Sequence, residues 1–381
     1  MRNLQLVVAA TAMAAVLVAG MPHRAAAEVV AEEMRTQYEA IRVVRIVGGL
    51  DRPWSVAFLP DGGYLVTERP GRLQLVRDGE ATPIAGVPDI HAASQGGLLD
   101  VVLHPEYADN GWVYLTYSKG GSGGTATALG RGRLDGDQLV DFEELFVQDR
   151  FSAPGRHYGS RLAWLGDGTL LMSIGDRGNE PPRAQDPRDH AGKLLRLKDD
   201  GGVPADNPFV DRDDVHPEIF SLGHRNIQGL IVTPDSDEIW ATEHGPRGGD
   251  ELNLVEAGKN YGWPVVSQGR DYRTEEQFGE GRSGVGYEPP VYEFLPTLAP
   301  SGLALVTQDR FPRWQGNLLA GGLRAERIRR VVLEDGVVVH DEELLLKLVG
   351  RIRDVREGPD GHIYVLTDEA DGGLYRIESA R

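Results

Sequence analysis

Short apolar stretches alternate with turn-forming residues along most of the chain. One sequence motif recurs, in which a turn rich in Pro, Asp, Asn or Gly is followed at once by a short apolar strand. Six copies, spaced about 45 to 80 residues apart, begin at Leu59, His104, Leu165, Thr233, Arg313 and Gly358. In each copy we expect the turn to supply positive-φ residues and the strand to supply a buried face of alternating side chains.

Six copies of one motif are typical of the blades of a β-propeller. A β-sandwich also contains many short strands, but the sixfold repetition of one motif favours the propeller. The sequence therefore predicts an all-β fold, a single six-bladed β-propeller of four-stranded antiparallel blades over residues 41–381. We expect the strand Ile41–Val47 to pair with the C-terminal strands and close the ring, which removes exposed sheet edges. Residues 28–40 are expected to form an N-terminal arm, with a short helix over Ala31–Ala40.

The first residues have the pattern of a secretory signal peptide. Arg2 precedes an apolar run from Leu4 to about Met21, and the small residues Ala25–Ala27 offer a cleavage site. We therefore expect a signal peptide over residues 1–27 and a periplasmic or secreted mature protein. The apolar run is about as long as a membrane span, so an uncleaved anchor is the alternative. After cleavage, no remaining stretch is apolar enough to cross a bilayer.

The composition excludes some partners. The chain has 40 Lys and Arg against 58 Asp and Glu, a formal net charge of −18. Removing the leader takes away Arg2 and Arg24 and no acid, which gives −20. This charge argues against nucleic acid as a partner, because phosphate binding requires a basic face. The chain has no cysteine, so any redox chemistry must come from a cofactor.

Arginines stand out in loops of several blades of this acidic chain, at Arg225, Arg324, Arg351 and Arg353. Propeller sites lie on the loops at one mouth of the ring, where these guanidinium groups would repel one another unless they surround an anion. Because arginine binds carboxylates in a bidentate manner, they indicate a small ligand with several carboxylates. The alternative is that each arginine pairs with a local acid, such as Asp354 beside Arg353.

Two further patterns suggest chemistry. Gly245 and Pro246 could offer backbone carbonyls to a hard cation such as Ca²⁺, and Asp250 and Glu251 could serve a second ion. The alternative is a plain acidic turn. His157 is the best candidate for a general base, because a neutral imidazole accepts a proton near pH 7.

Asp176, one strand later than His157, could orient its ring. A structural surface histidine is the alternative for His157. Gln95, which precedes two glycines, and Asn226, which follows Arg225, are further polar residues in loops of this kind.

Taken together, these segments resemble the soluble pyrroloquinoline quinone (PQQ)-dependent sugar dehydrogenases, and most closely their aldose sugar dehydrogenase branch. The resemblance runs from about Leu50 to the C-terminus. The strings that carry it are GGLLDVVLHPEYADNGWVYLTYS, HYGSRL, GHRNIQGL, EHGPRGGDELN, GKNYGWP and RIRDV. The family fold is a six-bladed propeller, which agrees with the number of repeats.

The resemblance implies a role for each matching residue. His157 would be the general base that removes the hydroxyl proton at the anomeric carbon of the sugar, and Asp176 would orient it. Hydride would pass from that carbon to quinone C5. Residues that would contact the cofactor, or the cofactor and the substrate, are Gln95, Arg225, Asn226, Arg324, Arg351 and Arg353.

The resemblance also implies two Ca²⁺ ions. The carbonyls of Gly245 and Pro246 would bind the ion that bridges to PQQ, and Asp250, Glu251 and Tyr261 would form a second, structural site. The implied partners are an aldose and an electron acceptor, either a cytochrome or a quinone. The sequence also departs from the family pattern. Arg156 replaces an acid of the glucose-oxidising members, and a cofactor-binding lysine of those members falls near the position of Arg324, which keeps the charge.

Two rival functions fit the same fold. A Ca²⁺-dependent lactonase is also a six-bladed acidic propeller, but it needs carboxylate and Asn ligands at the axis and no arginine cluster. A non-catalytic binding propeller would not need His157, Asp176 and the arginines together. The residues from 177 to 190 do not align cleanly with the family, so Gln185 and Asp186 receive no role.

Overall fold

The computed structural model describes residues 27–380 and contains all six of the recurring turns. Each turn contains one residue with a positive φ, as expected: Gly62, Gly111, Gly168, Asp237, Gly316 and Gly361. These residues reverse the chain between the first and second strands of a blade. The predicted signal peptide over residues 1–27 lies outside the described residues, apart from Ala27.

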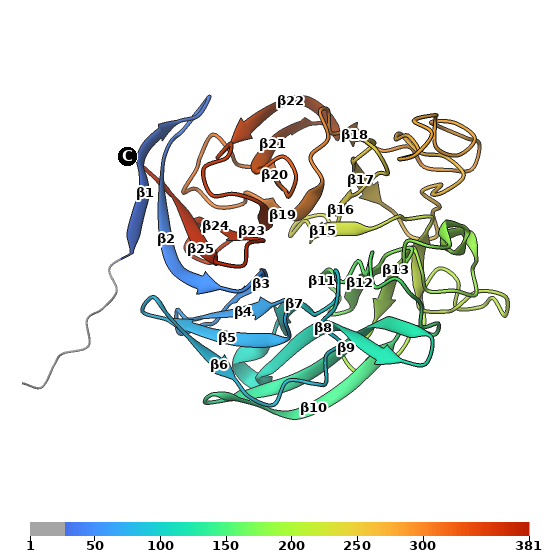
Figure 1. Ribbon diagram of the computed structural model, residues 1–381, viewed down its shortest axis with the longest axis horizontal. Helices are drawn as coiled ribbons and strands as arrows, with labels where there is room; N and C mark the ends of the chain where they lie inside the picture. The colour runs from blue at the N-terminus through green and yellow to red at the C-terminus, as the bar shows by residue number, and fades with distance from the viewer. Residues whose placement is uncertain (1–26, 381) are drawn as a thin grey trace, which may run out of the picture.

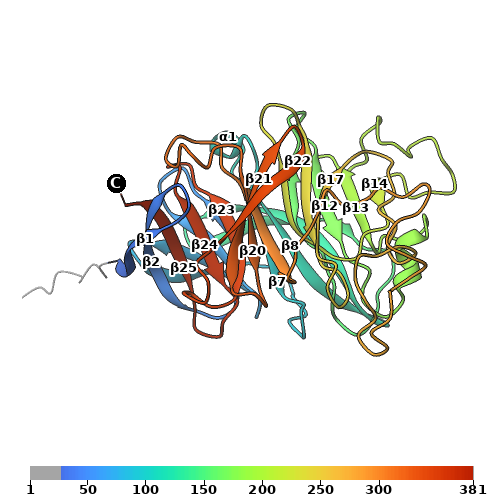
Figure 2. The same cartoon turned by 90° about the horizontal axis from the view of Figure 1, so that it is seen from above.

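Six antiparallel sheets stand around a central axis (Figures 1 and 2). Blade 1 contains β3 (Pro53–Phe58), β4 (Tyr64–Glu68), β5 (Arg72–Arg77) and β6 (Glu80–Ile84). Blade 2 contains β7 (Leu98–Leu103), β8 (Trp112–Gly121), β9 (Gly124–Asp135) and β10 (Gln138–Val147). Blade 3 contains β11 (Leu162–Trp164), β12 (Leu170–Ile174), β13 (Lys193–Leu197) and β14 (Ile219–Leu222).

The second half of the chain repeats this arrangement. Blade 4 contains β15 (Ile227–Val232), β16 (Ile239–Glu243), β17 (Glu251–Val255) and β18 (Tyr292–Glu293). Blade 5 contains β19 (Pro300–Leu305), β20 (Leu318–Gly322), β21 (Arg327–Glu334) and β22 (Val337–Leu344). Blade 6 contains β23 (Ile352–Glu357), β24 (Ile363–Thr367), β25 (Gly372–Ser379), β2 (Ala40–Leu50) and β1 (Glu28–Arg35). The helical segments of residues 27–380 are α1 (Tyr107–Asn110) and η1 (Pro181–Gln185), a 3₁₀ turn.

The first strand of each blade lies nearest the axis (Figure 1). Each of these inner strands lies next to the inner strand of the following blade, and β23 lies next to β3. The predicted six-bladed propeller is therefore confirmed.

The predicted closure of the ring is also confirmed. Strand β2 pairs antiparallel with β25, with Ile41 opposite Ser379 and Val43 opposite Ile377. The N-terminal and C-terminal ends of the propeller thus share one blade, and β25 has no open edge.

The predicted helix over residues 31–40 is wrong. Residues 28–35 form β1, which pairs antiparallel with β2 and adds a fifth strand to blade 6. Val30, Ala31 and Met34 pack partly buried against the core between blades 5 and 6. Backbone pairing with the free edge of β2, together with this packing, outweighs the local helix preference.

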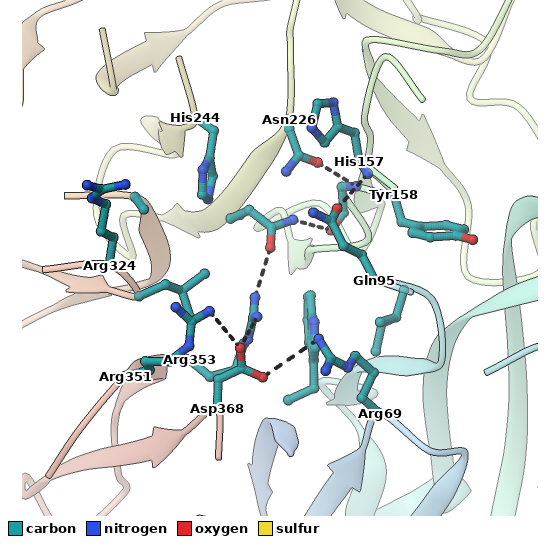
Figure 3. Close-up of a pocket in the computed structure, with 16 residues that line it drawn as sticks. Arg69, Gln95, His157, Tyr158, Asn226, His244, Arg324, Arg351, Arg353 and Asp368 are labelled. Carbon is teal, nitrogen blue, oxygen red and sulfur yellow. Dashed lines mark hydrogen bonds and ion pairs between the residues drawn. The ribbon is translucent and has the colours of Figure 1, made fainter. Parts of the chain in front are cut away.

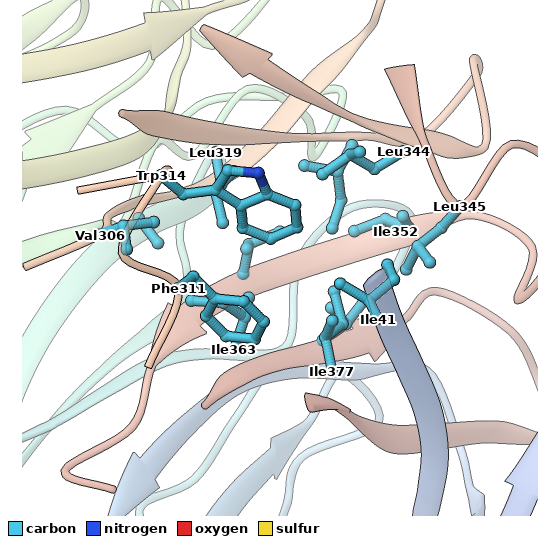
Figure 4. Packing of buried hydrophobic residues seen from close by; sticks show 14 of the residues in the cluster. Ile41, Val306, Phe311, Trp314, Leu319, Leu344, Leu345, Ile352, Ile363 and Ile377 are labelled. Atoms are coloured by element: carbon cyan, nitrogen blue, oxygen red, sulfur yellow. The ribbon is translucent and has the colours of Figure 1, made fainter. Parts of the chain in front are cut away.

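Apolar side chains fill the spaces between neighbouring blades. Between blades 5 and 6 the core includes Trp314, which is fully buried and stacks on Phe311 with ring centroids 4.9 Å apart (Figure 4). Ile41 of β2 lies in the same cluster, so the closing strand contributes to the core as well as to the sheet. In the part of the chain that the structure describes, no helix is long and apolar enough to cross a membrane.

Two truncations test the closure. A chain that begins at Ala40 loses β1 but keeps β2, and we expect its melting temperature to fall by only a few degrees. A chain that begins at Asp51 loses β2 as well, which exposes the edge of β25 and removes the fully buried Ile41 and Val43 from the core. Each buried aliphatic side chain contributes about 1.5–3 kcal/mol, so this chain should fail to fold or melt far lower. Thermal unfolding followed by circular dichroism measures both. Equal melting of the Asp51 chain and the chain that begins at Glu28 would contradict the closure.

Candidate active site

The direction of the strands determines which loops share one mouth of the propeller. In an antiparallel blade, the inner strand begins at the same end at which the second strand finishes. Loops that lead into inner strands and loops that follow second strands therefore open on the same face. The first kind carries Gln95, His157, Arg225, Asn226 and Arg351, and the second kind carries Arg69, Asp176, His244, Arg324 and Asp368.

These two kinds of loop surround a cavity of about 230 Å³ at this mouth (Figure 3). Six of the predicted site residues line it, namely Gln95, His157, Asn226, Arg324, Arg351 and Arg353. Residues that line it without having been predicted include Trp54, Arg69, Gln228, His244 and Asp368. In Figure 3, Arg351, Arg353 and Asp368 lie across the cavity from His157 and Asn226.

The cavity is positively charged, although the protein is acidic. Asp368 is the one carboxylate among the described lining residues, and the arginines are Arg69, Arg324, Arg351 and Arg353. Four positive charges and one negative charge leave an excess of three. The structure brings Arg324, Arg351 and Arg353 together at one mouth, as predicted, whereas Arg225 is not among the residues that line the cavity.

Asp368 binds three of these arginines. Its Oδ2 atom lies 2.9 Å from Nη2 of Arg353 and 3.0 Å from Nη2 of Arg351, and its Oδ1 atom lies 3.8 Å from Nη1 of Arg69. Burial alone would raise the pKa of Asp368, but the charges of Arg353, Arg69 and Arg351 hold it below its usual value. Arg353 therefore pairs with Asp368 and not with the adjacent Asp354, which was the alternative.

His157 is held in one orientation. Its Nδ1 atom lies 2.6 Å from Oδ1 of Asp176, and Oδ2 of Asp176 accepts a hydrogen bond of 2.8 Å from the indole of Trp263. The backbone N–H of Gly178 also donates to Asp176. Nδ1 is thereby occupied, which leaves Nε2 as the ring nitrogen that can act on a ligand. Only 13% of the His157 side chain is exposed.

The pKa of His157 lies below its ordinary value. Burial is the main cause, the hydrogen bond to Asp176 opposes it, and the nearby charge of Arg225 lowers it further. His157 is therefore neutral near pH 7 and can accept a proton. His244 also lines the cavity, and burial lowers its pKa to about 4, so it is neutral as well.

Arg225 and Asn226 reach the site in different ways. Arg225 extends over the ring of Trp263, 5.2 Å from its centroid, and donates to the carbonyl of His244 at 3.3 Å. Asn226 lines the cavity, and its side-chain oxygen accepts a hydrogen bond from the backbone N–H of Gly159. Gln95 accepts a hydrogen bond of 2.8 Å from the backbone N–H of His157. Gln95 and Asn226 therefore fix the loop that carries His157.

Gly245 and Pro246 border a second cavity, which shares His244, Ala299 and Arg324 with the first. Asp250 lines this second cavity, where its carboxylate accepts hydrogen bonds from Gly245 and from the segment 297–299. Four donors occupy this carboxylate, so its evident role is to hold the two loops together.

Glu251 and Tyr261 do not line the cavity that Asp250 lines. They line a small separate cavity with residues of the segment 266–290. Burial, followed by the charge of Glu243, raises the pKa of Glu251 to about 8. The Tyr261 hydroxyl is already bonded, because it donates to the carbonyl of Leu254 and accepts from the N–H of Glu256. The structure thus brings together two of the three residues expected at one site.

The comparison with known proteins identifies the family. Residues 50–376 match the family described as Glucose / Sorbosone dehydrogenase. The chain belongs to this family. It is an oxidoreductase of the sugar dehydrogenase class, which favours the dehydrogenase over the lactonase and the binding propeller.

Individual relatives agree with the family match. This dehydrogenase is 43% identical over 337 residues to the aldose sugar dehydrogenase YliI of Escherichia coli, covering 86% of this chain and 90% of that protein. The apo crystal structure of the soluble aldose sugar dehydrogenase from E. coli is 41% identical with a TM-score of 0.86, covering 89% of this chain and 99% of that chain. The PQQ-bound aldose sugar dehydrogenase from Streptomyces coelicolor is 27% identical with a TM-score of 0.75, covering 91% of this chain and all of that chain.

Three of the cavity residues that the sequence analysis missed share one position, whereas Trp54 and Gln228 lie within the inner strands β3 and β15. Arg69, His244 and Asp368 each follow the second strand of a blade, as Asp176 and Arg324 do. That position after each second strand was visible in the sequence and could have revealed them. Gln185, which received no role, donates to the carbonyl of Trp263 at 2.7 Å and to Asn260, and it does not line the main cavity.

Asp368→Asn tests the charge balance of the cavity. The change leaves the buried Arg353 without its carboxylate partner, and breaking a buried pair costs about 3–5 kcal/mol. We expect the ligand-free protein to melt several degrees lower at low ionic strength, as measured by calorimetry. Glu180→Gln breaks the exposed pair with Arg150 and is the matched control, with a cost below about 1 kcal/mol. Melting of Asp368→Asn at the temperature of the control would contradict this charge balance.

Proposed function

We propose that this dehydrogenase oxidises aldose sugars at the anomeric carbon to lactones, with PQQ bound in the positively charged cavity. The observation that carries the proposal is a cavity lined by four arginines and a single carboxylate, with a neutral and oriented histidine in its wall. A cavity of this charge favours an anion with several carboxylates.

The residues present fit PQQ, a planar o-quinone with three carboxylates. The excess of three positive charges around the cavity equals the charge of those carboxylates. In addition, Nε of Arg353 and Nε of Arg225 are buried and have no hydrogen-bond partner among the described residues. Buried donors are rarely left unpaired in native proteins, so such atoms favour a missing acceptor. Arg324, Arg351 and Arg353 would hold the carboxylates.

His157 would act as the general base. Its Nε2 atom would take the proton from the hydroxyl on the anomeric carbon, and Asp176 would stabilise the resulting imidazolium through Nδ1. When bound, PQQ would supply the two-electron acceptor, with the anomeric hydrogen leaving as hydride to quinone C5. Arg225 would place a positive charge beside the position where negative charge develops, and Asn226 and Gln95 would orient the reacting groups.

Two sites fit Ca²⁺. Gly245 and Pro246 border the cavity that Arg324 also lines, and the Pro246 carbonyl accepts a hydrogen bond of 2.8 Å from the Tyr272 hydroxyl. A Ca²⁺ ion held by the carbonyls of Gly245 and Pro246 would polarise a quinone oxygen. Glu251 is a partly buried carboxylate opposite Glu243 in the β16–β17 pair, and a cation between them would remove their repulsion. We assign Glu251 and Tyr261 to this second site, with Tyr261 acting through its backbone carbonyl, and we assign Asp250 to loop positioning.

The proposal extends to the place of the reaction. The N-terminal signal pattern favours a periplasmic or secreted enzyme, so the electrons would pass to an acceptor outside the cytoplasm. A cytochrome or a quinone is the acceptor class that the family resemblance implies.

His157→Ala tests the mechanism. The change removes the base without altering any arginine, so we expect kcat for aldose oxidation to fall by at least about 10²-fold while PQQ still binds. Steady-state dye reduction measures kcat, and equilibrium dialysis measures PQQ binding. His340→Ala changes an exposed histidine of β22 and is the matched control, with unchanged kcat. Near-normal turnover of His157→Ala would remove His157 from the mechanism.

A further inference from the structure

A second group of chemically active side chains lies at the outer edge between blades 2 and 3. Asp149 follows β10, His190 precedes β13 and His216 precedes β14. Each offers one ligand atom, and these atoms lie within 4.8 Å of one another. None of the three lines the cavity described above. We propose that Asp149, His190 and His216 bind a divalent transition metal, and that Zn²⁺ fits the ligand set best.

The hydrogen bonds of His190 point to a cation. Nε2 of His190 lies 2.6 Å from a carboxylate oxygen of Glu218, and Nδ1 accepts a hydrogen bond of 3.2 Å from the backbone N–H of Asp149. With the ring proton on Nε2, Nδ1 carries a lone pair. A carboxylate oxygen of Asp149 nevertheless lies 2.9 Å from Nδ1. Two acceptors this close repel each other unless a cation or a proton lies between them.

The second histidine completes the set. His216 stacks on His190 with ring centroids 4.2 Å apart, and its Nε2 atom lies 3.2 Å from the other carboxylate oxygen of Asp149. The carbonyl of Arg188 lies 3.0 Å from the same Nε2. Ligand atoms around a tetrahedral Zn²⁺ are about 3.3 Å apart, since each lies about 2.0–2.1 Å from the metal. The separations of 2.9 and 3.2 Å, each to a different oxygen of Asp149, are close to this value, and one ligand atom from each of the three residues lies within 4.8 Å of the others.

The charges also match a divalent cation. Among the described residues, no lysine or arginine forms an ion pair with Asp149 or Glu218, whose salt-bridge partners are the two histidines. Two carboxylates and two neutral imidazoles carry a charge of −2. Two nitrogen ligands and one carboxylate favour Zn²⁺ over Ca²⁺, which prefers oxygen ligands.

Burial separates the roles of the four residues. The His190 side chain is 4% exposed and Glu218 is 14% exposed, so Glu218 would orient His190 from behind, as carboxylates do in zinc sites. Asp149 and His216 are each about one-third exposed, which leaves room for a water as fourth ligand. The metal would tie the end of blade 2 to the two loops that precede β13 and β14.

Zinc binding to the whole protein tests the proposal. The protein is first saturated with Ca²⁺, so that oxygen-ligand sites are filled, and is then dialysed against micromolar Zn²⁺. We expect one zinc ion per chain by elemental analysis, and a visible spectrum typical of four-coordinate Co²⁺ when cobalt replaces zinc. His216→Gln should lose the ion, while His340→Gln, outside the cluster, should keep it. Glu218→Gln should weaken the affinity by about 10- to 100-fold.

Either of two results would overturn the proposal. One is that the unchanged protein binds no more zinc than His216→Gln, with both variants folded by circular dichroism. The other is that His216→Gln retains the ion and the cobalt spectrum. The cluster would then be joined by a proton on His190, with Asp149 and Glu218 as its partners.

Discussion

A buried network of ion pairs at the axis is the interaction on which the rest of the structure depends. Nη1 of Arg161 lies 3.0 Å from Asp354 and 3.5 Å from Asp100, and the Arg356 guanidinium lies 2.9 Å from Asp100 and 3.0 Å from Asp354. These residues come from the inner strands of blades 2 and 6 and from the residue preceding the inner strand of blade 3. Buried charges are tolerated only when they are paired and hydrogen-bonded, so the blades must keep their register.

This network also forms the floor of the active site. Arg161 donates to the carbonyl of Arg353 at 3.1 Å and lies over the ring of Trp54, which lines the cavity. Two arginines and two aspartates make the network neutral. The excess of positive charge therefore belongs to the layer above it, where Asp368 is the one carboxylate among the described residues that line the cavity. A rigid and neutral floor beneath a positive layer is suited to hold a planar polyanion in one position.

The sequence predicted the parts of the fold that depend on local chemistry. The turn motifs identified all six blades, because each turn needs a positive-φ residue, and the need to close the ring identified Ile41–Val47 as the closing strand. The strand β1 was predicted as a helix because its conformation depends on pairing with β2, and local propensity contains no information about such a partner.

The candidate site was predicted unevenly for a similar reason. Residues in conspicuous strings, such as His157 and Arg353, were found. Arg69 and Asp368 sit singly after ordinary strands, and they become recognisable only when all second strands are known to end at one mouth. Asp250 was grouped with Glu251 by adjacency, yet neighbouring residues at the start of a strand face opposite sides and enter different cavities.

Reconstitution of the protein tests the central claim most directly. The chain is purified without cofactor and supplied with PQQ, with Ca²⁺, with both, or with both and EDTA, and dye reduction is followed over a panel of aldoses. The account predicts sugar-dependent turnover only when PQQ and Ca²⁺ are both present. Failure of PQQ to bind, or turnover that does not require it, would contradict the assignment of the arginine-lined cavity.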